Sequence, residues 1–207
     1  MIMTPIRALV CLLAAALAGC SSGPPPVDTR PYEQQILAAR ADKDAAFRGA
    51  DESPIPIDKR ASFAGLTYYP VDPTYRVPAS LREERSDKPV MIELETSKGQ
   101  RDRLRKVGAL GFTLKGQPLR LTAFANVNAR TFDRLFVPFG DLTNRSETYG
   151  GGRYLELTRT ATGLYDLDFN QAYHPYCVYN YDYECPVPPP ENRLAIAIPA
   201  GEKLGQK

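Results

Sequence analysis

Three consecutive glycines followed by an arginine, Gly150-Gly151-Gly152-Arg153, carry the most direct chemical signal in the chain. Glycine allows left-handed backbone conformations and a close approach to a ligand. Successive N–H groups in such a turn can form a concave nest for an anion, and the planar guanidinium of Arg153 suits a carboxylate or phosphate. The unit predicts either a cradle for an anionic group or a simple hairpin turn. It differs from the nucleotide-binding loop, which also needs a lysine and a following helix.

Polar and aromatic residues gather around this unit, between residues 136 and 193. Tyrosine rings offer flat apolar faces with a hydroxyl group, which suits sugars or peptides. Most of the 12 tyrosines are nevertheless expected to pack against strands. The candidate ligand-binding residues are Tyr149, Gly151, Gly152, Arg153, Asn170, Tyr173 and Asn192.

Three carboxylates in the same region are candidates for catalysis: Asp141, Glu147 and Asp168. Carboxylate chemistry needs two such groups with separated pKa values, and Arg153 with the glycine turn would stabilise developing negative charge. The structural alternatives are that Asp141 caps a turn and that Glu147 pairs with Arg153. The sequence alone leaves the catalytic residues unknown.

His174 is the only histidine, so a histidine-dependent triad would need a nucleophile and an orienting group that the sequence does not identify. With Cys177 and Cys185 it could ligate zinc. In an exported chain the two cysteines are expected to form a disulfide instead. We therefore expect no metal and no cofactor.

The N-terminus reads as a bacterial lipoprotein signal. Arg7 precedes an uncharged apolar run, and the run ends in Leu17-Ala18-Gly19-Cys20. A short basic segment, an apolar stretch and small residues at a cleavage site describe a secretory signal, and the run is too short to span a bilayer. Residues 1–19 are predicted to be removed and Cys20 to carry the lipid.

Residues 20–30 then form a tether rich in proline, which cannot bury enough surface to fold. Ser21 favours the outer over the inner membrane, with the domain facing the periplasm or the cell surface. The bilayer is thus the predicted partner, reached through acylated Cys20. A formal charge of +2 argues against binding nucleic acid.

Residues 31–207 are predicted to form one domain that begins with an amphipathic helix over 31–48. Apolar residues recur at helical spacing on one face, with Lys43 as the single polar break; that face comprises Tyr32, Ile36, Ala39, Lys43 and Phe47. Pro31 suits the first turn, and Gly49 is a plausible stop.

After the helix the pattern changes to short strands separated by turns. Strands are expected at 90–95, 110–114, 119–124, 134–139, 153–158, 165–169 and 194–198. Arg101, Arg103, Arg105 and Lys106 form the densest basic stretch, read as the solvated face of a strand rather than a lipid contact. The predicted fold is mainly β, an antiparallel sandwich or barrel with one helix packed on it.

Several stretches resemble the domain-of-unknown-function 1684 family. They are Phe63–Leu66, Phe136–Asp141, Glu147–Leu155, Asp168–Tyr173 and Cys185–Lys203, within which Pro188–Leu194 and Ala200–Lys203 are the most diagnostic. The resemblance covers roughly residues 36–204. It implies that helix and sheet form one unit, and it assigns no activity.

Two functions compete on these observations. The first is an envelope lipoprotein that binds a small anionic or glycan ligand, or an envelope partner. The second is a hydrolase with a carboxylate and arginine site within residues 141–193. The sequence names neither the ligand nor the oligomeric state.

Overall fold

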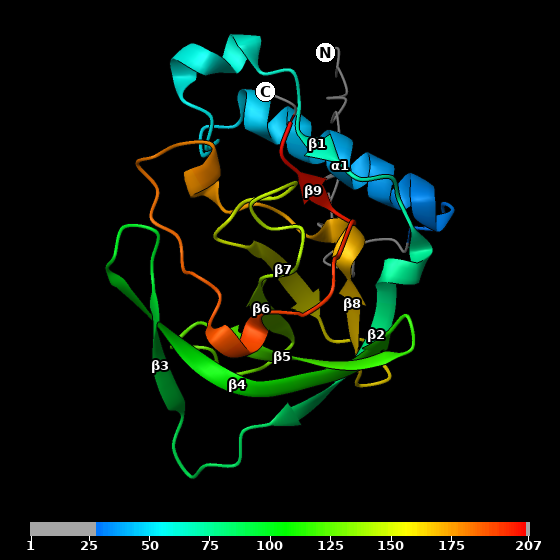
Figure 1. Cartoon of the computed structure of the whole chain (residues 1–207), viewed down its shortest axis with the longest axis vertical. Coiled ribbons are helices and arrows are strands. Elements are labelled where there is room, and N and C mark those ends of the chain that lie inside the picture. The colour runs from blue at the N-terminus through cyan, green and yellow to red at the C-terminus, as the bar shows by residue number, and fades with distance from the viewer. Residues whose placement is uncertain (1–27, 206–207) are drawn as a thin grey trace, which may run out of the picture.

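The computed structural model describes residues 28–205, so the predicted signal peptide, Cys20 and most of the predicted tether lie outside the described part. A seven-stranded antiparallel sheet curls into a nearly closed barrel, and the helix α1 (Tyr32–Gly49) lies across one end of it (Figure 1). The mainly β fold class with an N-terminal helix is therefore confirmed. Among the described residues, no helix has the length and apolar character needed to cross a bilayer.

The main sheet has the strand order β7-β6-β5-β4-β2-β8, and β3 pairs with β4 off this path. Its strands are β2 (Arg76–Glu83), β3 (Val90–Glu95), β4 (Arg101–Leu114), β5 (Gln117–Ala125), β6 (Arg134–Phe139), β7 (Arg153–Thr158) and β8 (Tyr165–Asp168). A small second sheet pairs β1 (Thr67–Tyr68) with β9 (Glu202–Lys203) beside α1. Five single-turn or two-turn 3-10 helices fill connections at η1 (Ile57–Ser62), η2 (Pro73–Tyr75), η3 (Phe169–Gln171), η4 (Tyr176–Val178) and η5 (Pro190–Asn192).

The barrel nearly closes because β7 and β8 are consecutive strands joined by a short hairpin, with a bridge between Arg159 and Tyr165. Side chains that alternate along the strands fill the interior. Fully buried examples are Leu110, Leu121, Phe139, Leu155, Leu167 and Phe169. The sheet is thus a packed core, and space for a ligand must lie at its ends or edges.

Three strand predictions coincide with β3, β6 and β7, while the strand predicted at 194–198 is wrong. That segment is apolar because Leu194 and Ile198 are buried, but it runs outside the ladders. Its backbone bonds instead to the segment that follows β6, as when Leu142 N–H donates to the carbonyl of Ile196. The strand β2 was not predicted, because Pro78 and the charged residues of this strand obscure the alternation of apolar and polar side chains.

The helix matches its predicted span to within one residue at each end. Pro31 occupies the N-cap position rather than the first turn, and Gly49 is the last helical residue. Ile36 and Phe47 are buried, so the face identified from the sequence is the face that packs on the barrel.

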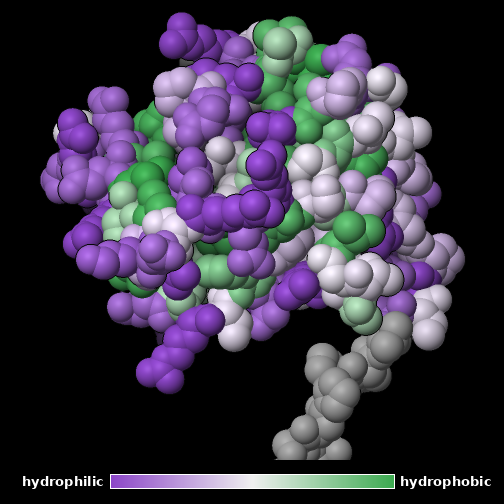
Figure 2. Space-filling model, turned by 90° about the horizontal axis from the view of Figure 1, so that it is seen from below, coloured by the Kyte–Doolittle hydropathy of each residue, from purple (hydrophilic) through white to green (hydrophobic). Residues whose placement is uncertain are grey.

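The basic stretch lies on β4, which pairs with β3 at the lower side of the molecule. Lys106 forms an ion pair with Glu84 at 3.0 Å, and Arg101 lies 3.7 Å from Glu93. Figure 2 shows this side as a mixture of hydrophilic and hydrophobic side chains. The acidic partners agree with the interpretation of the stretch as a solvated strand face.

Arg153 fastens the C-terminal segment to the barrel from a fully buried position. Its guanidinium donates to Asp141 at 2.9 Å and to the carbonyls of Ile198 at 2.7 Å, Ala200 at 2.5 Å and Glu202 at 3.0 Å. A buried charge is tolerated only when it is paired and hydrogen-bonded. We call these four partners the Arg153 socket.

Gly201 lets the chain turn from this socket into β9. Its φ is +79°, and an added Cβ would lie 2.5 Å from the carbonyl oxygen of Ala172 and 2.6 Å from that of Phe169. Only glycine suits both the conformation and the space. Gly201 therefore sets where Glu202 lies.

His174 is buried close to the same segment. Burial is the largest cause that lowers its pKa, to about 3, and the positive charges of Arg153 and Lys43 act in the same direction. The imidazole is therefore neutral at neutral pH.

Removing the arginine from its socket should destabilise the whole fold. We expect Arg153→Met to lower the free energy of unfolding by about 3–5 kcal/mol, because Asp141 would remain buried without a partner. The exposed pair of Arg101 and Glu93 provides the control, since Arg101→Met should cost about 1 kcal/mol or less. Urea unfolding followed by circular dichroism measures both; equal losses would contradict the role of the socket.

The single histidine should resist protonation in the folded protein. We expect its imidazole NMR signals to keep neutral-form shifts from pH 7 down to about pH 4.5, whereas an exposed histidine titrates near 6.5. Below pH 6.5 the imidazole of His174 binds a proton in the unfolded chain, whereas in the native protein it does so only near pH 3. The free energy of unfolding should therefore decrease as the pH is lowered through this window, by at most about 1.4 kcal/mol per pH unit.

His174→Gln should show a smaller fall over the same window, because the other titrating groups are unchanged. A folded-state titration with its midpoint near 6.5 would show that His174 reaches solvent.

Candidate functional site

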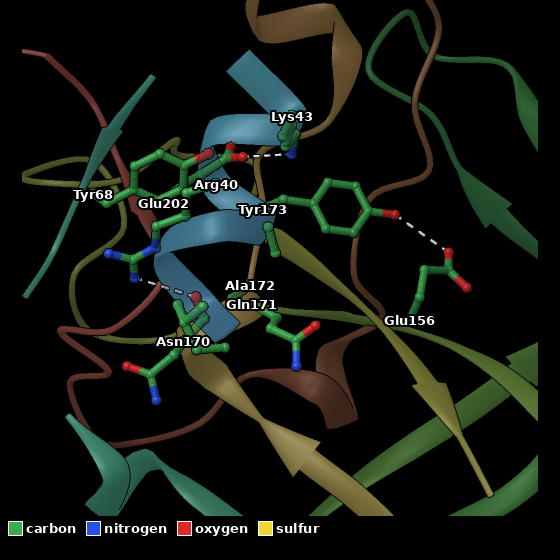
Figure 3. A pocket seen from close by; sticks show the side chains of 11 residues that line it. Arg40, Lys43, Tyr68, Glu156, Asn170, Gln171, Ala172, Tyr173 and Glu202 are labelled. Atoms are coloured by element: carbon green, nitrogen blue, oxygen red, sulfur yellow. Dashed lines mark hydrogen bonds and ion pairs between the residues drawn. The ribbon is translucent and has the colours of Figure 1, made fainter. Parts of the chain in front are cut away.

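A cavity of about 220 Å³ lies between α1 and the barrel, and a groove of about 490 Å³ adjoins it. Lys43 and Tyr173 line both, so the two depressions meet at these side chains. We call the pair of depressions the Lys43 site. The residues around the cavity are Ile36, Ala39, Arg40, Lys43, Tyr68, Glu156, Asn170, Gln171, Ala172, Tyr173 and Glu202 (Figure 3).

Glu202 is the charged centre of the cavity wall, although its side chain is only 1% exposed. Its carboxylate accepts from the Lys43 ammonium at 2.5 Å, from the backbone N–H of His174 at 2.7 Å and from the Tyr179 hydroxyl at 2.8 Å. These donors compensate its desolvation. The lysine on α1 thus joins the helix to β9 across the cavity.

Lys43 also lies over aromatic rings. Its ammonium is 4.6 Å from the centre of the Tyr173 ring and 5.2 Å from that of Phe47. Cation–π contacts of this length hold a cation in place. The Lys43 side chain, 26% exposed, is therefore fixed where the cavity opens into the groove.

Arg40 lies one turn before Lys43 and covers the other side of the cavity. Its guanidinium stacks 4.4 Å from the centre of the Tyr68 ring and donates to the carbonyls of Tyr69 at 3.0 Å and Asn170 at 3.3 Å. Burial is the largest cause that lowers its pKa. Because Figure 3 shows Arg40 and Lys43 on the same helix facing the same lining residues, α1 supplies both cations of the site.

The groove is mainly aromatic. Edge-to-face contacts join Phe136 to Tyr154 at 4.8 Å, Tyr154 to Tyr173 at 5.7 Å and Tyr176 to Tyr183 at 5.3 Å between ring centres. Its lining consists of Lys43, Phe136, Tyr154, Tyr173, Pro175, Tyr176, Tyr183, Glu184, Cys185 and Pro186. Such an apolar wall with a few polar groups is typical of small-ligand sites.

At the rim, the Tyr173 hydroxyl donates to Glu156 at 3.2 Å. Figure 3 shows Glu156 across the cavity from Glu202, with Tyr173 between them. The site thus offers ring faces, one fixed ammonium and carboxylate acceptors to a ligand.

Two of the predicted ligand-binding residues, Asn170 and Tyr173, line this site. Asn170 is 1% exposed and mainly structural. Its amide group donates to the Tyr32 hydroxyl at 2.9 Å and to the carbonyl of Asp72 at 2.8 Å, so it connects α1 to the chain before β2.

The other five predicted ligand-binding residues lie elsewhere. Arg153 is enclosed in its socket, and Asn192 is fully buried, where its side chain bonds the backbone of Thr122 and Pro138. The triple-glycine segment serves as a tight turn: Gly152 has φ +99°, and an added Cβ would lie 2.5 Å from the carbonyl oxygen of Phe139. Gly151, Gly152 and Tyr149 line neither the cavity nor the groove.

The three candidate catalytic carboxylates are not brought together in the Lys43 site, and each has its own environment. Asp141 pairs with Arg153 and accepts from the backbone of Thr143, which is the predicted turn cap. Asp168 is buried and accepts from the Tyr32 hydroxyl at 2.9 Å and the Gln171 amide at 3.0 Å. Glu147 is exposed. None of the three lines the cavity or the groove.

The zinc alternative finds no support in the geometry. His174 Nε2 accepts from the backbone N–H of Tyr149 at 3.3 Å, and within residues 28–205 no three metal-ligating side chains form a cluster. Cys177 and Cys185 are present as free thiols that lie side by side, with Cys177 N–H 3.2 Å from Cys185 Sγ. Their disulfide therefore stays a prediction.

Sequence reasoning missed Arg40, Lys43, Glu156 and Glu202 as site residues. One signal was available: Lys43 interrupts the apolar face of the helix, and a lysine on a face that packs must find a buried partner. Glu202 gave no local sign, because it follows a glycine near a short strand that only the tertiary structure reveals.

No curated protein matches the chain. The solution NMR structure of the uncharacterized protein from gene locus rrnAC0354 of Haloarcula marismortui is 40% identical, with a TM-score of 0.64 over 84% of this chain and 94% of that one. The family model described as "Protein of unknown function (DUF1684)" matches residues 61–203, which begins after α1. The chain therefore belongs to the DUF1684 family.

Proposed function

We propose that this domain binds a small glycan in the Lys43 site. The observation that carries the proposal is the junction at Lys43 and Tyr173, where a cavity with charged side chains in its wall opens into a groove lined by five aromatic rings. Sugars present flat apolar faces that stack on aromatic rings, and their hydroxyl groups bond to carboxylates and amides. The Lys43 site offers both kinds of contact side by side.

The charge balance of the site supports a neutral sugar over a strongly anionic ligand. The Lys43 ammonium is already paired with Glu202, and Glu156 adds a carboxylate at the rim. The Arg40 guanidinium donates to two carbonyls and stacks on a ring face, while its Nε–H has no partner among the described residues. The two cations of the site, Arg40 and Lys43, are therefore matched in number by the carboxylates Glu156 and Glu202.

We further propose that the domain is held at the cell envelope by lipid on Cys20, facing the periplasm or the cell surface. The support is the pattern of residues 1–20. Acyl chains contribute roughly 0.8 kcal/mol per buried methylene, so two or more chains hold a protein firmly. The anchor would keep the glycan site close to the bilayer.

Glycan binding is tested with chitotriose, a β-linked trimer whose equatorial substituents leave flat apolar faces. We expect the domain to bind it and Tyr183→Ala to weaken binding about fivefold to tenfold, since one stacking ring is worth about 1 kcal/mol or more. Tyr181→Ala is the matched control, because Tyr181 belongs to the same loop but is 83% exposed and outside the groove. Isothermal titration calorimetry measures all three proteins.

An unchanged affinity in Tyr183→Ala, or equal losses in both variants, would remove the groove from the binding site. A wild-type protein that does not bind chitotriose would contradict the proposed ligand class.

The anchor is tested by phase separation in Triton X-114. The wild-type protein made in a bacterial host should enter the detergent phase, and its N-terminal peptide should carry the mass of acyl chains on Cys20. Cys20→Ser should move the protein to the aqueous phase, whereas Cys177→Ser should not. Wild-type protein in the aqueous phase would contradict the anchor.

A further inference from the structure

Two cysteines meet at the wall of the groove, and they differ in exposure. Cys177 is half-buried, while Cys185 is 7% exposed and lines the groove. The backbone N–H of Cys177 points at Cys185 Sγ across 3.2 Å. Cys177 is therefore the more exposed residue of the pair, and Cys185 is the more buried one.

The turn of the β3–β4 hairpin holds this pair in place. Ser97 N–H donates to the carbonyl of Cys185 at 2.8 Å, and Cys185 N–H donates to the Ser97 hydroxyl at 3.2 Å. Hydrogen bonding from Cys185 is the largest cause that lowers the pKa of Cys177, with Ser97 and Tyr149 acting in the same direction. The contact with Cys177, together with burial, raises the pKa of Cys185.

We propose that Cys177 and Cys185 form a thiol–disulfide exchange site in which Cys177 attacks a small-molecule disulfide and Cys185 resolves the adduct. A partly exposed attacking cysteine beside a buried second cysteine is an arrangement that suits such exchange. The site makes the predicted Cys177–Cys185 bond reversible and gives it a role in the groove.

The exchange proceeds in two balanced steps. The Cys177 thiolate bonds to one sulfur of the small disulfide, whose S–S bond breaks and releases one thiolate that takes a proton from water. Cys185 then loses its proton to water and bonds to Cys177 Sγ, which releases the second thiol. The two cysteines are oxidised, and the small disulfide is reduced to two thiols.

Oxidation would act directly on the Lys43 site, and this part of the inference rests on the proposed function. The loop between the cysteines carries Tyr183 of the groove and Tyr179, whose hydroxyl donates to Glu202 at 2.8 Å. A bond between its ends removes conformations that the open loop can adopt. The oxidised protein is therefore the form with the better-ordered groove.

The exchange is tested in the native protein with oxidised glutathione. Trypsin leaves both cysteines in one peptide, residues 160–193, which contains no other cysteine. We expect this peptide to lose two hydrogen masses after oxidation and to regain them when native protein is returned to reduced glutathione. A peptide that keeps its mass, or a bond that reduced glutathione opens only after unfolding, would overturn the exchange.

Single variants distinguish the two thiols. Cys185→Ser should accumulate a glutathione adduct on Cys177, because the resolving sulfur is absent. Cys177→Ser should remain unmodified on Cys185 over the same time. Equal modification of both variants would overturn the assigned roles, and it would do so whether or not a glycan binds.

The effect on the groove is measured in two ways. Oxidised protein should bind chitotriose about threefold to tenfold more tightly than reduced protein, with hydrogen exchange slowed in residues 176–186. Equal exchange rates in the two forms would overturn the coupling to the groove. Because hydrogen exchange needs no ligand, a failure of chitotriose to bind would count against the glycan proposal alone.

Discussion

The ion pair between Arg153 and Asp141 is the constraint on which the rest of the structure depends. A guanidinium without solvent contact needs protein acceptors for its terminal N–H groups, and here three of these acceptors are carbonyls of one C-terminal segment. That requirement fixes the path of the segment, and Gly201 then turns it toward β9. Glu202 thereby reaches Lys43, so the electrostatics of the cavity follow from a contact in the core.

Three separate parts of the chain meet at the centre of the Lys43 site, which Tyr68 of β1 and Glu156 of β7 also line. The helix α1 brings Arg40 and Lys43, the segment after η3 brings Tyr173, and β9 brings Glu202. The groove adds rings from the loop near the two cysteines. Each part is held by its own contacts, and the site exists only where all three meet.

The sequence predicted those features that depend on local pattern. The helix of residues 31–48 and the strand 90–95 follow from periodicity, which reports how one element faces a core. The strand expected at 194–198 failed because its apolar residues pack through a loop held by Arg153. The ligand role expected for Arg153 was also drawn from its neighbours in sequence, whereas its three carbonyl partners lie 45 to 49 residues further on. Burial of a charge is decided by such distant acceptors, and no local pattern encodes it.

The separation between Arg153 and its socket has a consequence for how the chain is made. Until residues 198–202 have been synthesised, the Arg153 guanidinium has no carbonyls to accept its hydrogen bonds. Strand β7 cannot bury this charge without a large desolvation cost. During synthesis, the second half of the chain would therefore stay loosely structured, and the barrel would close late. A polypeptide that completes its core only at this stage remains without a fixed tertiary structure for longer during its synthesis.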